Sequence, residues 1–163
     1  MAEHTNWRLT AAQIMMKTGN RFIAYLPSFN LGGDALLLLA DYETIDWLMS
    51  QFQRLSNTPV AFTSCPSFVI GDGDPVESDG RCLLVVKLDN QVGGSHLIRE
   101  SETTFGWSVS RSSANRYREL LSGMLGPRPG HQYLDPDNSP PAPVVIVSRG
   151  EYQPEVVRSW IKC

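Results

Sequence analysis

The chain has 163 residues, 42% of them hydrophobic and 19% charged, which is enough for one domain whose core needs neither disulfides nor a metal. Its formal net charge of -3 argues against a protein that coats nucleic acid or an anionic membrane. The first residues lack a basic start followed by an apolar run, and the longest apolar run, 35–40, is too short to span a membrane, so we expect a cytoplasmic protein.

The first half of the chain predicts strands followed by one amphipathic helix. Residues 5–16 and 21–28 have the composition of strands joined by a tight turn, and 35–40 that of a short buried strand. Asp41 is typical of a helix N-cap, because its carboxylate can accept hydrogen bonds from the free amides of the first turn. Pro59 ends the helix. Its apolar stripe consists of Ile45, Leu48, Met49, Phe52 and Leu55.

The second half repeats this order of elements. Strands are expected over 81–89, 94–99 and 103–110, and Ser112 or Ser113 can cap the helix that follows. The stripe of this helix lies 72 positions after that of the first helix. We therefore expect two related strand-strand-strand-helix units; the alternative is that two amphipathic patterns agree by chance. The second stripe consists of Tyr117, Leu120, Leu121 and Met124.

Together these patterns predict a single α+β domain over 1–163 with a mostly antiparallel sheet and two main helices on one face. The repeated units would cover about 5–56 and 81–126, and the other sheet face would be open or covered by loops. A short strand is expected at 60–63. The proline-rich connector before residue 144 would be irregular, and a strand and a short helix would follow within 144–161.

The loop 71–80 alternates acidic residues with glycine and proline. Carboxylates in this arrangement suit a calcium ion, but the twelve-residue spacing and closing glutamate of a calcium-binding loop are absent. Acidic residues beside glycine and proline are also good turn formers. We therefore expect a solvated connection without a metal. If an ion does bind, its ligands are Asp72, Asp74, Glu77 and Asp79.

The sequence holds no pattern that indicates catalysis. Cys65, Cys82 and Cys163 lack C-x-x-C spacing, which favours free thiols in a reducing compartment. Cys82 alternates with apolar residues, so a buried structural thiol is favoured over a nucleophile. Phosphate-binding loops, dinucleotide fingerprints, paired-histidine zinc motifs and serine nucleophile elbows are all missing, and no cofactor is expected.

The segments 131–137 and 148–152 combine aromatic, charged and histidine residues on backbone that flanks a strand. Functional groups often lie on loops held by such a scaffold. The alternative is structural: the two tyrosines would close one end of the core, and the arginine would pair with a neighbouring carboxylate for about 0–1 kcal/mol. The candidate contacts to a partner or ligand are His131, Tyr133, Asp135, Arg149, Glu151 and Tyr152.

The segments 130–135 and 147–152 resemble the C-terminal part of small bacterial proteins, some of them similar to immunity proteins of polymorphic toxin systems. The resemblance covers about the last third of the chain. It implies a cytoplasmic protein that neutralises a cognate toxin by direct binding, and it supplies no catalytic residues.

We therefore expect a non-enzymatic binding protein with a protein partner. The alternative is a small enzyme or ligand-binding protein with its site near 131–152. A homo-oligomer that buries the sheet face is compatible with both.

Overall fold

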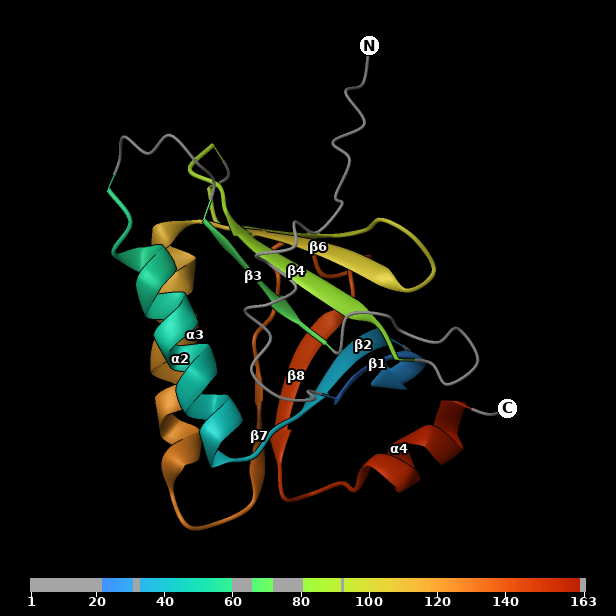
Figure 1. The fold of residues 1–163 in the computed structure, drawn as a ribbon. Coiled ribbons are helices and arrows are strands. Elements are labelled where there is room, and N and C mark those ends of the chain that lie inside the picture. The colour runs from blue at the N-terminus through green and yellow to red at the C-terminus, as the bar shows by residue number, and fades with distance from the viewer. Residues whose placement is uncertain (1–21, 31–32, 60–65, 72–80, 92, 162–163) are drawn as a thin grey trace.

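The computed structural model describes residues 22–30, 33–59, 66–71, 81–91 and 93–161, and its strands form two four-stranded sheets (Figure 1). Sheet A contains, in spatial order, β1 (Phe22–Asn30), β2 (Gly33–Leu39), β8 (Val144–Arg149) and β7 (Gly130–Tyr133). Sheet B contains β3 (Ser67–Ile70), β4 (Leu83–Leu88), β6 (Thr104–Val109) and β5 (Ser95–Arg99). In each sheet the outer pairs are antiparallel and the central pair, β2 with β8 or β4 with β6, is parallel.

The helices are α2 (Tyr42–Ser56), α3 (Arg111–Ser122) with a 3-10 turn, η2 (Gly123–Leu125), and α4 (Pro154–Ile161). The expected α+β class, the mostly antiparallel pairing and the two main helices are therefore confirmed. The strands divide between two sheets, however, where one was expected. In the described ranges no helix is both long enough and apolar enough to cross a membrane.

Side-chain caps start both main helices. Asp41 accepts a hydrogen bond from the Thr44 amide at 2.7 Å, as its sequence position predicted. Helix α3 begins earlier than expected, because Ser110 is extended and accepts from the Ser113 amide at 3.2 Å. Ser113 itself is buried in the first turn, so the expected cap at Ser112 or Ser113 is wrong.

One core is shared by both helices and both sheets. The caps Asp41 and Ser110 lie 69 positions apart, and the same spacing relates the buried residues of the two helices. This spacing replaces the expected 72. A shift of three residues is close to one helical turn, so it leaves the apolar stripe on the same face. The matched buried pairs are Ile45 with Ala114, Leu48 with Tyr117, Phe52 with Leu121, and Leu55 with Met124.

Within the described residues the repeated unit is strand-strand-helix-strand-strand. The first unit is β1-β2-α2-β3-β4 and the second is β5-β6-α3-β7-β8. Each sheet takes the first hairpin of one unit and the second hairpin of the other, so the two units are related by an approximate two-fold axis. The strands expected at 5–16 and 60–63 lie outside the described residues. The connector expected to be irregular contains β7, whose short polar sequence gave no alternating pattern.

Helix α4 covers the face of sheet A that points away from α2 and α3 (Figure 1). Its Val157 is fully buried in a second apolar cluster with β1, β2 and β8. The C-terminal helix is therefore confirmed, and this face of sheet A is closed by a helix. The strand members of the cluster are Ala24, Leu26, Ala35, Leu37 and Ile146.

Gly94 lies directly before β5 with φ at +140°, a conformation that favours glycine. A Cβ at this position would collide with Oδ2 of Asp137, which accepts a hydrogen bond from the Ser95 amide at 2.6 Å. Asn138 adds two bonds, accepting from the Leu97 amide and donating to the Leu97 carbonyl oxygen. The segment after β7 thus closes the outer edge of β5, and it needs a glycine at position 94.

We expect Gly94→Ala to lower the free energy of unfolding by about 2 kcal/mol, because alanine resists this φ and displaces the Asp137 carboxylate. Gly93→Ala is the matched control, since a Cβ there meets no atom within 4 Å, and its effect should stay below about 0.5 kcal/mol. Urea denaturation followed by circular dichroism measures both. Equal stability of the two variants would contradict the role of Gly94.

Candidate functional site

The structure brings His131 and Glu151 together at the edge of sheet A. Nδ1 of His131 lies 2.9 Å from Oε2 of Glu151, and the hydroxyl of Ser148 donates to the same oxygen at 3.1 Å. Ser148 and His131 are cross-strand neighbours in β8 and β7, and the turn after β8 brings Glu151 back over them. Both groups bond the carboxylate and not each other, so this trio does not form a serine nucleophile with its base.

Arg149 has a structural role in the core. Its Nε donates to the Met124 carbonyl oxygen at 3.0 Å, and its Nη2 donates to the carbonyl oxygens of Gly126 and Arg128. Its guanidinium also lies 4.2 Å from the ring centroid of Tyr42. Met124 lies in η2, and Gly126 and Arg128 follow it, so Arg149 ties the end of β8 to the turn and the segment after α3. The expected pairing of Arg149 with Glu151 or Asp135 is therefore not what the structure shows.

Of the remaining three candidates, Tyr133 and Tyr152 both pack against the second apolar cluster, as the structural alternative expected, and Asp135 lies elsewhere. Tyr133 packs edge-on to the His131 ring at 5.4 Å between centroids, whereas Tyr152 packs against Trp160 at 5.3 Å. The main-chain oxygen of Asp135 accepts a hydrogen bond from the Tyr117 hydroxyl at 2.9 Å. Burial raises the pKa of the Asp135 carboxyl group. His131 and Arg149 line a cavity of about 430 Å³, but the other four candidates do not.

The candidate metal ligands lie outside the described residues, whereas one candidate thiol, Cys82, lies within them. The metal candidates Asp72, Asp74, Glu77 and Asp79 lie outside the described residues, as do Cys65 and Cys163. In the part of the chain that is described, no three His, Cys, Asp or Glu side chains come together as they would around a metal ion. Cys82 is buried, and this burial raises the pKa of its thiol to about 12. Such a thiol stays protonated near neutral pH and is a poor nucleophile.

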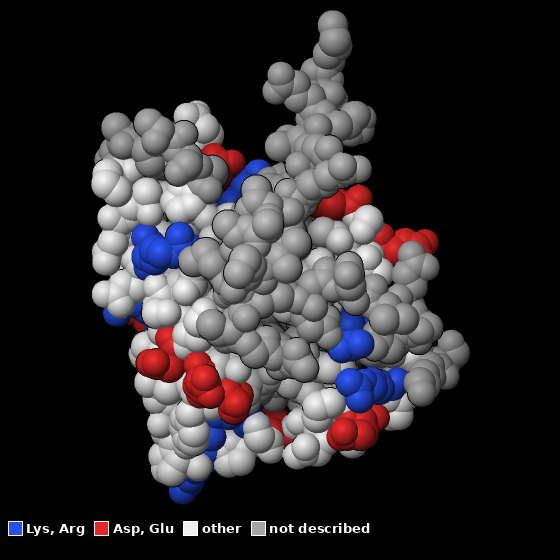
Figure 2. Space-filling view, viewed as in Figure 1, with Lys and Arg blue, Asp and Glu red and all other residues white. Residues whose placement is uncertain are grey.

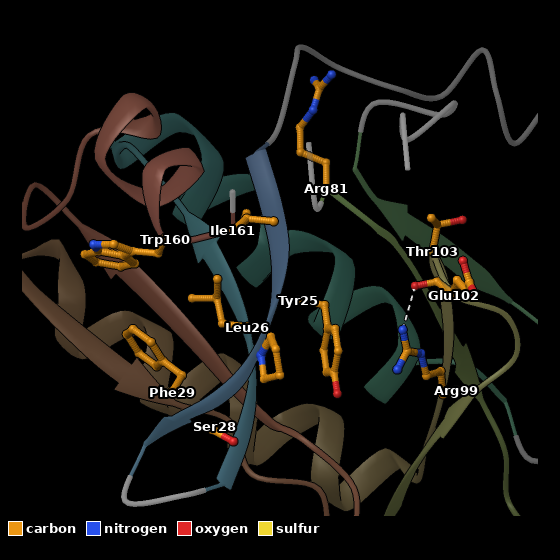
Figure 3. Close-up of a pocket in the computed structure, with 11 residues that line it drawn as sticks. Tyr25, Leu26, Ser28, Phe29, Arg81, Arg99, Glu102, Thr103, Trp160 and Ile161 are labelled. Carbon is orange, nitrogen blue, oxygen red and sulfur yellow. Dashed lines mark hydrogen bonds between the residues drawn. The ribbon is translucent and has the colours of Figure 1, made fainter. Parts of the chain in front are cut away.

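A cleft of about 640 Å³ opens between the end of β1, the β5–β6 loop and α4 (Figure 3). Figure 3 shows Tyr25 and Arg99 facing each other on one side and Phe29 and Trp160 together on the other. We call it the Arg99 cleft. Its principal lining residues are Tyr25, Phe29, Arg99, Glu102, Trp160 and Ile161.

Backbone carbonyls hold the guanidinium of Arg99 in place. Its Nε donates to the Ser101 oxygen at 3.2 Å and its Nη2 to the Glu102 oxygen at 2.9 Å. The group lies 4.4 Å from the ring centroid of Tyr25 and 5.5 Å from that of Phe105. The third nitrogen, Nη1, takes part in neither of these bonds, and Arg99 is exposed. One face of a positioned cation is thus available to a ligand.

Asp34, which contacts Tyr25, is already engaged in hydrogen bonds. Tyr25 donates its hydroxyl to Oδ2 of Asp34 at 2.6 Å, and the Ser28 amide donates to Oδ1 at 3.0 Å. The hydrogen bond from Tyr25 is the main cause that lowers the pKa of Asp34, while burial followed by that same bond raises the pKa of Tyr25. No carboxylate of the described residues forms an ion pair with Arg99.

An aromatic shelf forms the opposite side. The ring of Trp160, from α4, lies 5.6 Å from that of Phe29 at the end of β1 and 5.3 Å from that of Tyr152. Trp160 is 39% exposed and lines the cleft. Aromatic pairs at these distances are stable, and they offer apolar surface to a partner.

Known protein families, curated proteins and solved structures gave no match to this chain. On the face shown in Figure 2 the acidic and basic groups of the described residues are interspersed, without one large patch of either sign.

The sequence pattern did not point to this cleft. Tyr25, Arg99 and Trp160 come from three distant parts of the chain, and the candidates taken from the sequence lay within 131–152. One signal does exist in the repeat. Tyr25 pairs with Leu36 as Arg99 pairs with Phe105, so Tyr25 and Arg99 occupy equivalent positions on either side of the two-fold axis. Equivalent positions near such an axis lie close together whatever their separation in sequence.

Proposed function

We propose that this chain is a non-enzymatic binding protein that holds a protein partner at the Arg99 cleft. The observation that carries the proposal is the lining of the cleft, where Tyr25, Arg99 and Trp160 surround an open space of about 640 Å³. Tyrosine, arginine and tryptophan are the residues most enriched among those that dominate binding energy at protein interfaces.

The engagement of the polar side chains elsewhere favours binding over catalysis. Ser95 and Tyr117 share a buried hydrogen bond at 2.5 Å, which with the bond from Tyr117 to Asp135 joins β5, α3 and the segment after β7. His131 is paired with Glu151, and the Arg149 guanidinium is directed at main-chain carbonyls. An enzyme site near 131–152 is the weaker candidate. Its cation, Arg149, already donates hydrogen bonds to three carbonyl oxygens.

The form of binding that the sequence resemblance favours is neutralisation of a cognate toxin in the cytoplasm. Support comes from segments 130–135 and 147–152, which include β7 and the end of β8. A modest negative charge is compatible with a basic partner, since complementary charge speeds association.

The test uses the product of a toxin-like reading frame beside the gene for this chain. We expect the two purified proteins to form a complex and co-expression to relieve toxicity. Trp160→Ala should weaken the complex at least tenfold, because Trp160 is the largest partly exposed ring of the cleft. Isothermal titration calorimetry measures the affinity.

Val156→Ala is the matched control, since Val156 lies on the same helix, is 45% exposed and does not line the cleft. Its complex should have the affinity of the unchanged chain. Absence of both binding and relief of toxicity would refute the proposed function. Equal affinity of the Trp160 and Val156 variants would place the interface elsewhere.

A further inference from the structure

We infer that the Arg99 cleft recognises a carboxylate that neighbours an aromatic or aliphatic side chain, with the carboxylate on Arg99 and the apolar group on Phe29 and Trp160. The inference rests on the proposed binding function and names the chemistry of the partner segment. It follows from three features of the cleft: a positioned cation, a surplus of one positive charge at that position, and an apolar shelf opposite.

The first feature is the positioning of the cation. Two carbonyl oxygens and the face of Tyr25 fix the guanidinium of Arg99, as described above. An arginine that is held before binding loses little side-chain entropy when a carboxylate joins its free side. Charge-assisted bonds between guanidinium and carboxylate are about twice as strong as neutral hydrogen bonds.

The second feature is the local charge. Asp34 lies close enough to Arg99 for its pKa to be lowered by that charge, but its oxygens are bonded to Tyr25 and to the Ser28 amide. Arg81 and Glu102 also line the cleft, so together with Arg99 its lining carries one more positive charge than negative. A single carboxylate therefore fits this cleft better than a phosphate. The net charge of -3 points the same way, since it disfavours polyanions.

The third feature is the apolar shelf, together with the absence of a main-chain donor at one position of the strand beside it. Phe29, Trp160 and Ile161 offer apolar surface across from Arg99 (Figure 3). Pro27 lies between them on β1 and has no main-chain amide, so a partner strand cannot extend the sheet at this position. Recognition must come from side chains, and the cleft has room for a charged group and a ring at the same time.

The experiment compares N-acetyl-L-phenylalanine with its amide, two probes that differ only in the carboxylate. Both are titrated into the full chain labelled with nitrogen-15. The indole signal of Trp160 is followed by NMR and assigned with Trp160→Phe. We expect the acid to shift this signal with a dissociation constant of about 1 mM, and the amide to bind at least tenfold more weakly.

Substitutions of Arg99 test whether this residue causes the preference for the acid over the amide. Arg99→Gln should remove the preference for the acid, and Arg99→Lys should keep part of it, because lysine retains the charge without the planar fork. Arg128→Gln is the matched control, since Arg128 is exposed and lines a different cavity. It should leave the preference unchanged. Thermal unfolding of each variant shows that the fold is retained.

Two outcomes would overturn the inference. Equal binding of the acid and the amide would show that no carboxylate is recognised. Equal shifts by inorganic phosphate would indicate a general anion site. The proposed function is judged separately: a partner that binds with the same affinity to the Arg99→Gln variant leaves that function intact and refutes only the chemistry. If the cleft selects the acid but no protein partner binds the chain, the chemistry is supported and the proposed function is refuted.

Discussion

Replacing Arg149 by methionine should lower the free energy of unfolding by about 3 kcal/mol, because it removes a donor from three carbonyl oxygens, of which that of Gly126 keeps another, the Tyr42 hydroxyl. Arg149 is only 9% exposed, so water cannot fully take the place of its guanidinium. Methionine has a similar length and fills the space, which keeps the loss of packing small. The expected loss is therefore that of the hydrogen bonds and of the contact with Tyr42.

Urea denaturation of the Arg149 variant, with Arg128→Met as control, measures this effect. Arg128 is exposed, so its replacement should cost less than about 0.5 kcal/mol. Arg149→Lys should lie between the two, since an ammonium group cannot satisfy the same three acceptors. The folded Arg149 variant should still select N-acetyl-L-phenylalanine over its amide. A stable variant that loses this selectivity would show that Arg149 serves ligand binding.

Phe52→Ala should lower the free energy of unfolding by about 3–5 kcal/mol, the range for a large ring removed from a core. Phe52 is fully buried on α2, and its ring lies 5.2 Å from that of Phe68, 5.6 Å from Tyr117 and 6.0 Å from Trp107. Those three residues come from β3, α3 and β6. Phe52 thus joins the two repeated units at their shared core.

Leu125→Ala provides the comparison for Phe52→Ala, because Leu125 is apolar but 43% exposed. Leu125→Ala should lower the free energy of unfolding by less than about 1 kcal/mol. Thermal and urea unfolding of both variants measure the difference, and Phe52→Leu should recover part of the stability. If Phe52→Ala cost no more than Leu125→Ala, the two units would not depend on this contact.

The helices were predictable because their causes are local. The apolar stripe of α2 and the Asp41 cap follow from residues three and four positions apart, and the structure confirms both. The burial of Cys82 could also be predicted from its alternation with apolar neighbours. For α3 the stripe was sufficient, but three serines compete for the cap, and only the extended backbone of Ser110 decides between them.

The residues of the candidate site show the limit of such patterns. Arg149 follows a run of buried strand residues, and its sequence neighbours suggested a charge partner or a ligand. Its true acceptors are carbonyl oxygens of η2 and of the segment after it, more than twenty positions away. A main-chain carbonyl has no sequence signature, so this role could not be predicted. The cleft was missed for a similar reason, since its residues come from β1, the β5–β6 loop and α4.

The sequence by itself determined the α+β class and the two amphipathic helices. Periodicity reports which face of an element is buried, and burial of one face is a local requirement. Only the tertiary structure decided that the hairpins are exchanged between two sheets, because strand neighbours are set by hydrogen bonds between distant segments. That exchange places Tyr25 beside Arg99 and lets α4 close the cleft with Trp160.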